Sequence, residues 1–476
     1  MAHNSTTDIV NALVAKGVLT EEEGALLTKG RTDEAAGQAK ALKKASKLSV
    51  SDAIDKATVY GDIRVRAEHR EGSGEQVSLS GKASSDAAAN QTGTVHDQYR
   101  DRARYKMTLG AKTESGNWYG DLAFAMGAAG RSDNATFGKT ATSLNDKETL
   151  FVKRAMVGYK ATDWLTVEAG RMDNPLYTTP MIWDADLTVE GLVEKAKFKA
   201  GNTDIFVTAG QLQYLGDHNV TNDVAKAQTT ELMVVQAGIK FPITDASSAK
   251  GALTYTNYSH STKSNFTPGV GTYGAGNALT GAFSSSTGAP ILQGANKGFA
   301  VDAYGVNDLN TIEIPAEVNY MVAGNVGVRL YGDYAYNISA DDRAKNAGLS
   351  LTGSSGSDDA AWMLGLVVGS AKDLQAFEGN KMAKGDWQAR IWYQDVGVWS
   401  VDPNAVDSDV FDSRVNMKGT TFKAQYNIEN NVYANFAYGH ATRKNALFGA
   451  AGIAGDLANT NLRSFDLVQL DLTYKF

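Results

Sequence analysis

Residues 465–476, which end the chain, read Phe-Asp-Leu-Val-Gln-Leu-Asp-Leu-Thr-Tyr-Lys-Phe. From Val468 to Phe476 every second residue is apolar, and the residues between them are polar. This period of two predicts a β-strand with one apolar and one polar face. Such a strand fits a soluble domain, with a core on one side and water on the other. It fits equally a membrane barrel, with lipid outside and a wet lumen inside.

The same alternation recurs from Val59 onward and predicts about sixteen strands. An even number of strands is typical of single-chain bacterial barrels. The predicted strands are 58–70, 98–114, 116–127, 148–160, 163–171, 188–200, 203–215, 229–242, 247–260, 309–323, 325–338, 359–370, 385–397, 411–428, 430–441 and 465–476.

The predicted connections alternate between long and short, which favours the membrane barrel over a soluble array of strands. Seven are interpreted as short turns, such as Gly201-Asn202 and Glu429-Asn430, and eight are long and rich in Gly, Ser, Asn and Asp. The long ones are 71–97, 128–147, 172–187, 216–228, 261–308, 339–358, 398–410 and 442–464. We therefore predict an all-β fold, a transmembrane antiparallel β-barrel with both ends on the short-turn side and the long loops external.

Composition agrees with a wet lumen. The chain has 476 residues, of which 43% are hydrophobic, and its mean hydropathy of −0.29 is low for one large core. No run of eighteen apolar residues predicts a transmembrane helix. A net charge of −7 argues against nucleic acid as a partner, and the absence of cysteine excludes thiol chemistry. Residues 1–4 lack the features of a signal peptide, so either one has been removed and a Met supplied, or the chain is not secreted.

Residues 1–56 are predicted to form a separate helical segment, before a barrel domain of 57–476. Apolar residues recur at roughly helical spacing from Asp8 to Leu27, Gly17 interrupts them, and Thr20 with Glu23 forms a capping box that starts a second helix. Residues 28–47 are rich in Ala and Lys and carry only a weak apolar stripe. Two interpretations stay open for this segment, a solvated helical tail and an oligomerising coiled coil.

The two faces of the predicted strands differ in charge. On strand 58–70, Ile63 and Val65 share one face, and Arg64 and Arg66 share the other. An Arg that faces lipid near the bilayer midplane costs about 2–4 kcal/mol, so the arginines are expected to face the lumen. The candidate lumen cations, which we call the basic ladder, are Arg64, Arg66, Arg100, Arg102, Arg104, Lys106 and Arg154.

A central block of sequence resembles a porin family of Gram-negative outer membranes. The resemblance lies in Gly170-Arg171, Asn174-Pro175, the run 183–187 (Trp-Asp-Ala-Asp-Leu) and 190–192 (Glu-Gly-Leu). The aromatic C-terminus with Tyr474 two residues before it is similar to the closing strand of outer-membrane barrels. The resemblance implies a homotrimeric, sixteen-stranded barrel surrounded by outer-membrane lipid and lipopolysaccharide, with residues 1–56 in the periplasm. The family is more distantly similar to phosphate-selective porins, but their basic-loop signature is missing, so phosphate selectivity is not carried over.

In porins of this size the third external loop folds into the lumen, and here that loop is 172–187. Its acids Asp173, Asp184 and Asp186 would then face the basic ladder and set a transverse field across a constriction. In the alternative, the loop stays external and the arginines pair with wall acids such as Glu68 and Glu168.

The predicted function is a water-filled channel for passive diffusion of small hydrophilic solutes and ions, with a mild preference for anions. The alternative is a structural or adhesin barrel plugged by loop 261–308, which is rich in Gly and Ser. An enzyme is disfavoured because the adjacent pair Ser259 and His260 would point to opposite faces of a strand. The six histidines show no metal-ligand spacing, and no cofactor is expected.

Overall fold

A computed structural model describes residues 10, 13–24, 26, 51, 53–75, 95–127, 132–138, 147–215, 230–260, 308–322, 326–346, 358–370, 374, 382–445, 456–457 and 461–476. The chain divides into two compact units, Met1–Ala57 and Thr58–Phe476. The predicted helix 28–47 and the plug candidate 261–308 lie outside the described residues, apart from Asp308. No helix in the described ranges is long and apolar enough to cross a membrane.

The first unit contains the predicted capping box. The backbone N–H of Thr20 donates to Glu23 Oε2 at 2.9 Å, and the N–H of Glu23 donates to Thr20 Oγ1 at 3.2 Å. These reciprocal bonds satisfy amide donors at the start of the helical residues 21–24.

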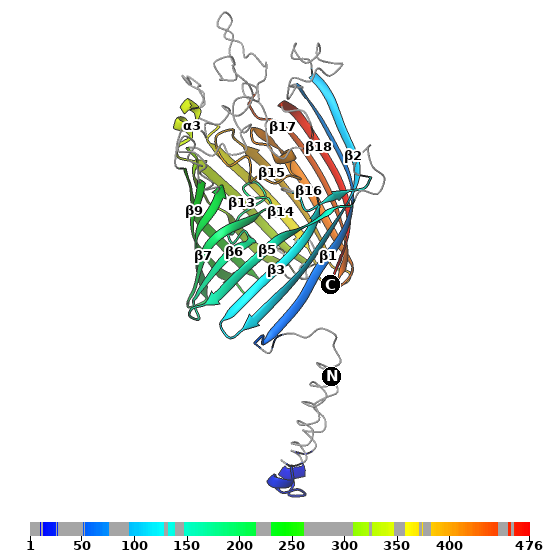
Figure 1. Ribbon diagram of the computed structural model, residues 1–476, viewed down its shortest axis with the longest axis vertical. Helices are drawn as coiled ribbons and strands as arrows, with labels where there is room; N and C mark the ends of the chain where they lie inside the picture. Colours follow the sequence, from blue (N-terminus) through cyan, green and yellow to red (C-terminus); the bar gives the residue numbers. More distant parts are fainter. Residues whose placement is uncertain are drawn as a thin grey trace, which may run out of the picture. The chain divides into compact units, whose positions relative to one another are not determined.

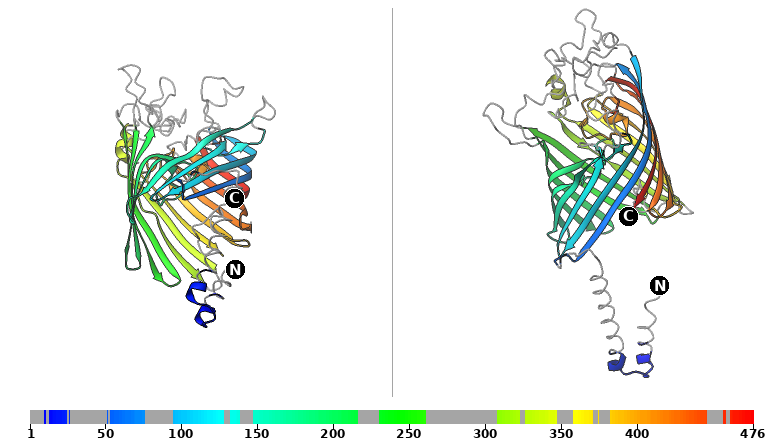
Figure 2. Two further views of the ribbon diagram at one scale, coloured as in Figure 1. Left: turned by 60° about the horizontal axis from the view of Figure 1, so that its bottom comes forward. Right: turned by 45° about the vertical axis from the view of Figure 1, so that its right-hand side comes forward.

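The second unit is a closed antiparallel barrel, in which consecutive strands pair and β1 pairs with β18 (Figures 1 and 2). The strands are β1 (Lys56–Glu75), β2 (Val95–Ser115), β3 (Trp118–Gly127), β4 (Ala135–Thr136), β5 (Thr149–Lys160), β6 (Leu165–Asp173), β7 (Thr188–Ala200), β8 (Thr203–Leu215), β9 (Thr230–Thr244), β10 (Ser247–His260), β11 (Asn310–Glu313), β12 (Ala316–Val322), β13 (Val326–Asn337), β14 (Ala360–Gly369), β15 (Trp387–Val396), β16 (Met417–Glu429), β17 (Val432–Arg443) and β18 (Asn461–Lys475).

Two of the barrel's sixteen strands are interrupted, so eighteen strand segments are numbered. The sequence predicts about sixteen strands. β11 and β12 both pair with β10 and β13, and Pro315 separates them because it cannot donate to the ladder. β4 pairs with β2 in line with β3, so these two also form one interrupted strand.

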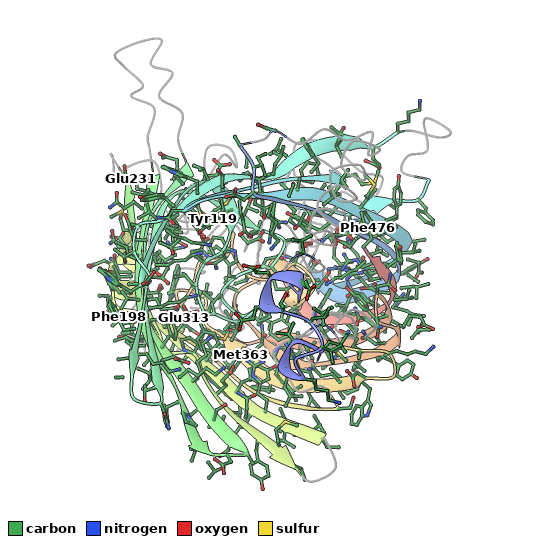
Figure 3. The ribbon with its side chains drawn as sticks, turned by 90° about the horizontal axis from the view of Figure 1, so that it is seen from below. Tyr119, Phe198, Glu231, Glu313, Met363 and Phe476 are labelled. Atoms are coloured by element: carbon green, nitrogen blue, oxygen red, sulfur yellow. The ribbon has the colours of Figure 1, made fainter. Side chains whose placement is uncertain are left out.

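In the barrel wall, apolar side chains point outward and polar side chains point inward, the reverse of a soluble protein. On β18, Leu470 and Leu472 are 58% and 51% exposed, whereas Gln469 and Asp471 are 2% and 5% exposed. The outward band of half-exposed aliphatic residues continues around the barrel; it includes Val65, Leu109, Leu122, Val157, Val235, Leu253, Leu330 and Leu364. Figure 3 shows Tyr119, Glu313 and Met363 pointing inward, and Phe198 and Phe476 pointing outward. An apolar outside with a polar inside is typical of a membrane-spanning barrel, and it decides between the two interpretations of the closing strand.

The sorting of connections holds with one exception. The connection between β14 and β15 is predicted to be a short turn, but β14 ends at Gly369 and β15 begins at Trp387, so it is a long one. Its Leu374 and Met382 are buried, and their carbonyls accept from the inner-wall amides of Gln388 and Asn427.

Inward rings are accommodated by glycines on the next strand. A Cβ on Gly158 would lie 2.1 Å from the Tyr119 ring, and one on Gly365 would lie 2.3 Å from the Tyr331 ring. In each pair the ring and the glycine are direct cross-strand neighbours. The glycines therefore let large inward side chains lie flat against the wall instead of filling the lumen.

Candidate functional site

The basic ladder occupies inward-facing positions on β1, β2 and β5, and it is largely neutralised by acids. Arg66 Nε donates to Asp471 at 2.7 Å, and its Nη1 lies 2.9 Å from Asp409. Arg102 donates to Glu68 at 2.5 Å and to Asp456. Arg100, at the long-loop end, also pairs with Asp456, at 3.1 Å.

Glu68 is the centre of this network. Its side chain is fully buried and lies 3.1 Å from Arg70, 3.8 Å from Arg66 and 4.0 Å from Arg104. Gln469 also donates to it, at 2.8 Å. A carboxylate so placed is stabilised by several guanidinium groups, and they in turn depend on it.

Arg70 belongs to the network, although it is not among the lumen cations that the sequence predicts. It is 1% exposed and pairs with Asp409 and Asp412, each at 3.0 Å. Arg70 is an even number of residues from Arg64 and Arg66, so the alternation of the strand predicts that it shares their inward face. The predicted strand ends at residue 70, however, whereas β1 continues to Glu75.

The other ladder residues contact both acids and uncharged polar groups. Arg64 donates to Asn134 at 2.6 Å and lies 3.7 Å from Asp471, and Arg104 donates to Ser132 at 2.8 Å. Arg154 lies 3.1 Å from Asp121 and donates to the Tyr60 hydroxyl at 2.6 Å.

The loop 174–187, which we call the first lumen loop, folds into the barrel. Near one wall, Lys106 Nζ lies 3.1 Å from Asp186. On the opposite side, Tyr177 donates to Glu317 of β12 at 2.7 Å, and Thr179 donates to Asp333 of β13 at 2.6 Å. The loop thus spans the lumen, and the alternative of an external loop is not what the structure adopts.

The three predicted acids have different surroundings. Asp173 ends β6 and pairs with Arg154 at 2.9 Å. Burial opposes ionisation of Asp186, but the charges of Lys106 and Lys153 lower the pKa of this carboxyl. Asp184 meets no ladder residue; it accepts the backbone N–H of Ser408 at 3.0 Å, and burial raises its pKa. Only two of the three acids therefore face the basic wall.

A second lumen loop, 397–416 between β15 and β16, was predicted to be partly an external loop and partly strand. Instead Trp399 and Phe411 are fully buried inside the barrel, in the main apolar cluster. Phe411, Asp412 and Asn416 have positive φ angles of 57–59°, a conformation incompatible with the predicted strand start at residue 411. Composition could not reveal this, because the loop is as rich in Asp as the connections predicted to be external.

The two lumen loops contact each other through the backbone. The N–H of Asp184 donates to the carbonyl of Ala405 at 2.6 Å, and the N–H of Asp407 donates to Pro180 at 3.2 Å. Burial and the nearby charge of Asp184 raise the pKa of Asp407 to about 7. Burial opposes ionisation of Asp409 as well, but Arg66 and Arg70 hold its pKa well below the usual range.

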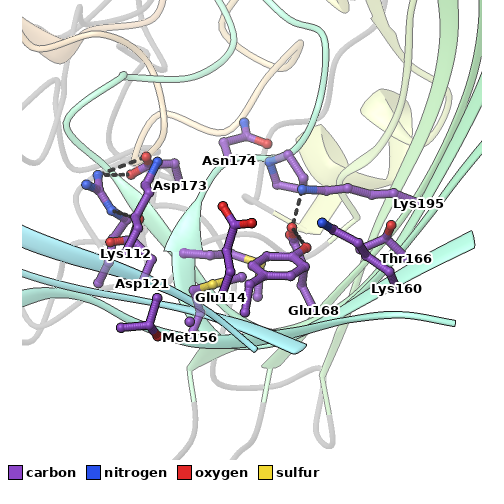
Figure 4. A pocket seen from close by; sticks show the side chains of 16 residues that line it. Lys112, Glu114, Asp121, Met156, Lys160, Thr166, Glu168, Asp173, Asn174 and Lys195 are labelled. Carbon is purple, nitrogen blue, oxygen red and sulfur yellow. Dashed lines mark hydrogen bonds and ion pairs between the residues drawn. The ribbon is translucent and has the colours of Figure 1, made fainter. Parts of the chain in front are cut away.

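Two cavities adjoin the first lumen loop on its short-turn side. One, of about 440 Å³, is lined by equal numbers of acids and bases: Glu114, Asp121, Glu168 and Asp173 with Lys112, Arg154, Lys160 and Lys195 (Figure 4). The other, of about 680 Å³, lies against β7–β10 and shares Pro175 and Lys195 with the first.

Comparison with known proteins assigns the family. Residues 38–476 match a family described as "Putative porin". The chain belongs to this porin family. Its membership and its barrel indicate an outer-membrane channel rather than an enzyme. A comparison with curated protein sequences finds no match.

Solved structures similar to this porin include outer-membrane channels of low sequence identity. The channel DcaP of Acinetobacter baumannii is 13% identical, with 90% of this chain and 99% of that chain covered and a TM-score of 0.41. An anion-selective porin from Comamonas acidovorans is 10% identical, with 88% and 99% covered and a TM-score of 0.41. Salmonella typhi OmpF in complex with daunomycin is 11% identical, with 90% and 99% covered and a TM-score of 0.42.

Proposed function

We propose that this porin is a water-filled channel through which small hydrophilic solutes and ions diffuse passively, with a mild preference for anions. The observation that carries the proposal is the charged lumen narrowed by the first lumen loop, with Lys106 and Arg154 on one side and Asp186 and Asp173 facing them. Opposed charges across a constriction orient dipolar solutes and sort ions by sign. The roles of the ladder and of the three loop acids are part of this proposal.

The proposed anion preference rests on those cations of the basic ladder that contact with acids neutralises least. One unit charge about 4 Å from an ion is worth ~1 kcal/mol in water and ~4 kcal/mol at an effective dielectric of 20. Arg104, 4.0 Å from its nearest described acid, therefore attracts anions more than Arg102, which meets Glu68 at 2.5 Å.

Planar-bilayer recordings test the proposal. We expect steps of ionic current, reversal potentials in a salt gradient that favour chloride, and a preference that falls as salt rises. Arg104→Glu should weaken this preference more than Arg102→Glu. Equal anion and cation permeability at low salt, unchanged in both variants, contradicts a selective ladder.

A structural or adhesin barrel is the second candidate. It is favoured by the second lumen loop, whose buried Trp399 and Phe411 occupy part of the barrel interior. A plugged barrel passes no ions, so the absence of current steps in the same recordings would favour it.

We further propose that the porin is a homotrimer embedded in outer-membrane lipid and lipopolysaccharide, with residues 1–56 in the periplasm. Both ends of the barrel lie at the short-turn end, and the helical residues of the first unit offer an assembly element. Native mass spectrometry of the full chain should detect trimers, and deletion of residues 1–50 should leave a folded barrel with weaker assembly. Monomers alone from the full chain refute the trimer.

A further inference from the structure

The larger cavity on the short-turn side of the first lumen loop has a strongly basic lining. Alternate inward positions on β7, β9 and β10 contribute five lysines to it, whereas Asp204 of β8 is its single acid. The lysines are Lys195, Lys197, Lys199, Lys240 and Lys250. The neighbouring cavity carries as many acids as bases, so the excess of positive charge distinguishes the larger cavity from it.

Most of this charge is not neutralised by contact. Lys195 pairs with Glu168 at 2.6 Å, and Lys199 lies 3.8 Å from Asp204. Among the residues that the structure describes, no carboxylate lies within 4.0 Å of Lys197, Lys240 or Lys250. The arginines of the basic ladder, by contrast, form ion pairs with Glu68, Asp409, Asp456 and Asp471. An anion that enters this cavity therefore meets three ammonium groups that no described carboxylate contacts.

The cavity also has a flat apolar wall that is fixed in place. The Phe206 ring lies over Gly238, where a Cβ would approach it to 2.2 Å. Tyr177 is held by paired hydrogen bonds between its backbone and the Gln236 amide, at 2.8 and 2.9 Å. Lys250 Nζ lies 3.6 Å from the centre of the Tyr177 ring and 5.4 Å from that of Phe206. The Lys250 ammonium therefore covers one face of the Tyr177 ring and lies near the Phe206 ring before any solute enters.

We propose that this cavity is a binding subsite for aromatic carboxylates on the diffusion path, an inference that rests on the proposed channel function. A carboxylate needs only point charges, which lysines supply, and the aromatic ring that carries it can pack on Phe206. Inorganic phosphate suits the site less, because the cavity offers no guanidinium fork and gives the anion an apolar wall.

The test compares three small solutes as blockers of chloride current through the full-length protein in planar bilayers. Benzoate has the charge and the ring, acetate has the charge alone, and benzyl alcohol has the ring alone. We expect benzoate to reduce the current at a lower concentration than acetate, and benzyl alcohol to have no effect.

Two variants separate the contributions. Lys197→Gln should raise the half-blocking concentration of benzoate and of acetate by about fivefold, the effect of one charge in water. Phe206→Leu should raise it for benzoate alone. Lys112→Gln, a matched change in the balanced cavity, should leave benzoate block unchanged.

Benzoate binding to the protein in detergent, measured by ligand-observed NMR, provides a readout that does not need conduction. Binding that weakens in Lys197→Gln and Phe206→Leu supports the subsite, even where no chloride current is found and the channel function itself fails. Normal chloride current with benzoate no more potent than acetate, or with binding unaltered by both variants, overturns the subsite.

Discussion

At the residue scale, Glu68 decides whether the basic wall is stable. It is fully buried among Arg66, Arg70, Arg102 and Arg104. Glu68→Gln keeps the shape but leaves these guanidinium groups short of a counter-charge. Breaking a buried ion pair typically costs about 3–5 kcal/mol, so we expect a loss of that size in denaturant unfolding.

The matched control is Glu429→Gln. Glu429 pairs with Lys384 at 2.6 Å, but both side chains are more than half exposed at the barrel rim. Solvent screens such pairs, so this change should leave the unfolding midpoint where it is. Equal effects of the two variants would mean that water in the lumen solvates the Glu68 network.

Asp407 gives the contact between the lumen loops a dependence on pH. Its pKa of about 7 lies above the ordinary value of 3.8, so the folded state binds its proton more tightly than the unfolded state. Stability from this group is complete below pH ~4 and is lost as pH rises through 7.

Asp407→Asn should therefore raise the melting temperature in detergent at pH 8 by roughly 1–3 °C, with little change at pH 4. Asp341→Asn, on the exposed face of α3 (Ala340–Asn346), serves as the control and should show no such difference. A gain for Asp407→Asn that is equal at both pH values contradicts the assignment.

At the element scale, the cross-strand pairs of ring and glycine set the shape of the wall. Gly365→Ala would push a methyl group to 2.3 Å from the Tyr331 ring, and overpacking of this kind costs about 1–3 kcal/mol. Gly439→Ala, also within a strand, meets nothing closer than 3.6 Å and should be neutral. Unfolding of both variants in denaturant would test the difference, and similar stability of the two would show that the Tyr331 ring moves aside freely.

The strands could be predicted from sequence because alternation with a period of two is a local property. Whether a residue is polar or apolar indicates which face of the strand it occupies. The ladder followed from the same parity, as Arg64 and Arg66 illustrate. The pairing with Glu68 was one of the two interpretations open from sequence, and the structure contains it. The partners Asp409 and Asp456 did not follow, because they reach the ladder from loops whose composition matches that of any external loop. The buried Trp399 gave no signal either, since a single Trp near a strand end also suits a membrane interface.

At the scale of the whole molecule, we expect the second lumen loop to limit both the width of the channel and its positive charge. Its apolar residues fill part of the barrel, and its Asp409 and Asp412 neutralise Arg66 and Arg70. Replacing residues 398–415 by a short Gly-Ser linker removes the obstruction and the acids together. We therefore expect both single-channel conductance and anion preference to rise.

Asp409→Asn separates the two effects, because it removes charge while the loop stays in place. Arg66 and Arg70, which lie 2.9 Å and 3.0 Å from Asp409, then attract anions more strongly. The reversal potential in a salt gradient should shift toward that of chloride, and the shift should shrink at high salt as screening shortens to ~3 Å near 1 M. Conductance should change much less than in the linker variant. If the linker variant conducts no better than the full-length porin, ions pass the barrel by a route that the second lumen loop does not restrict.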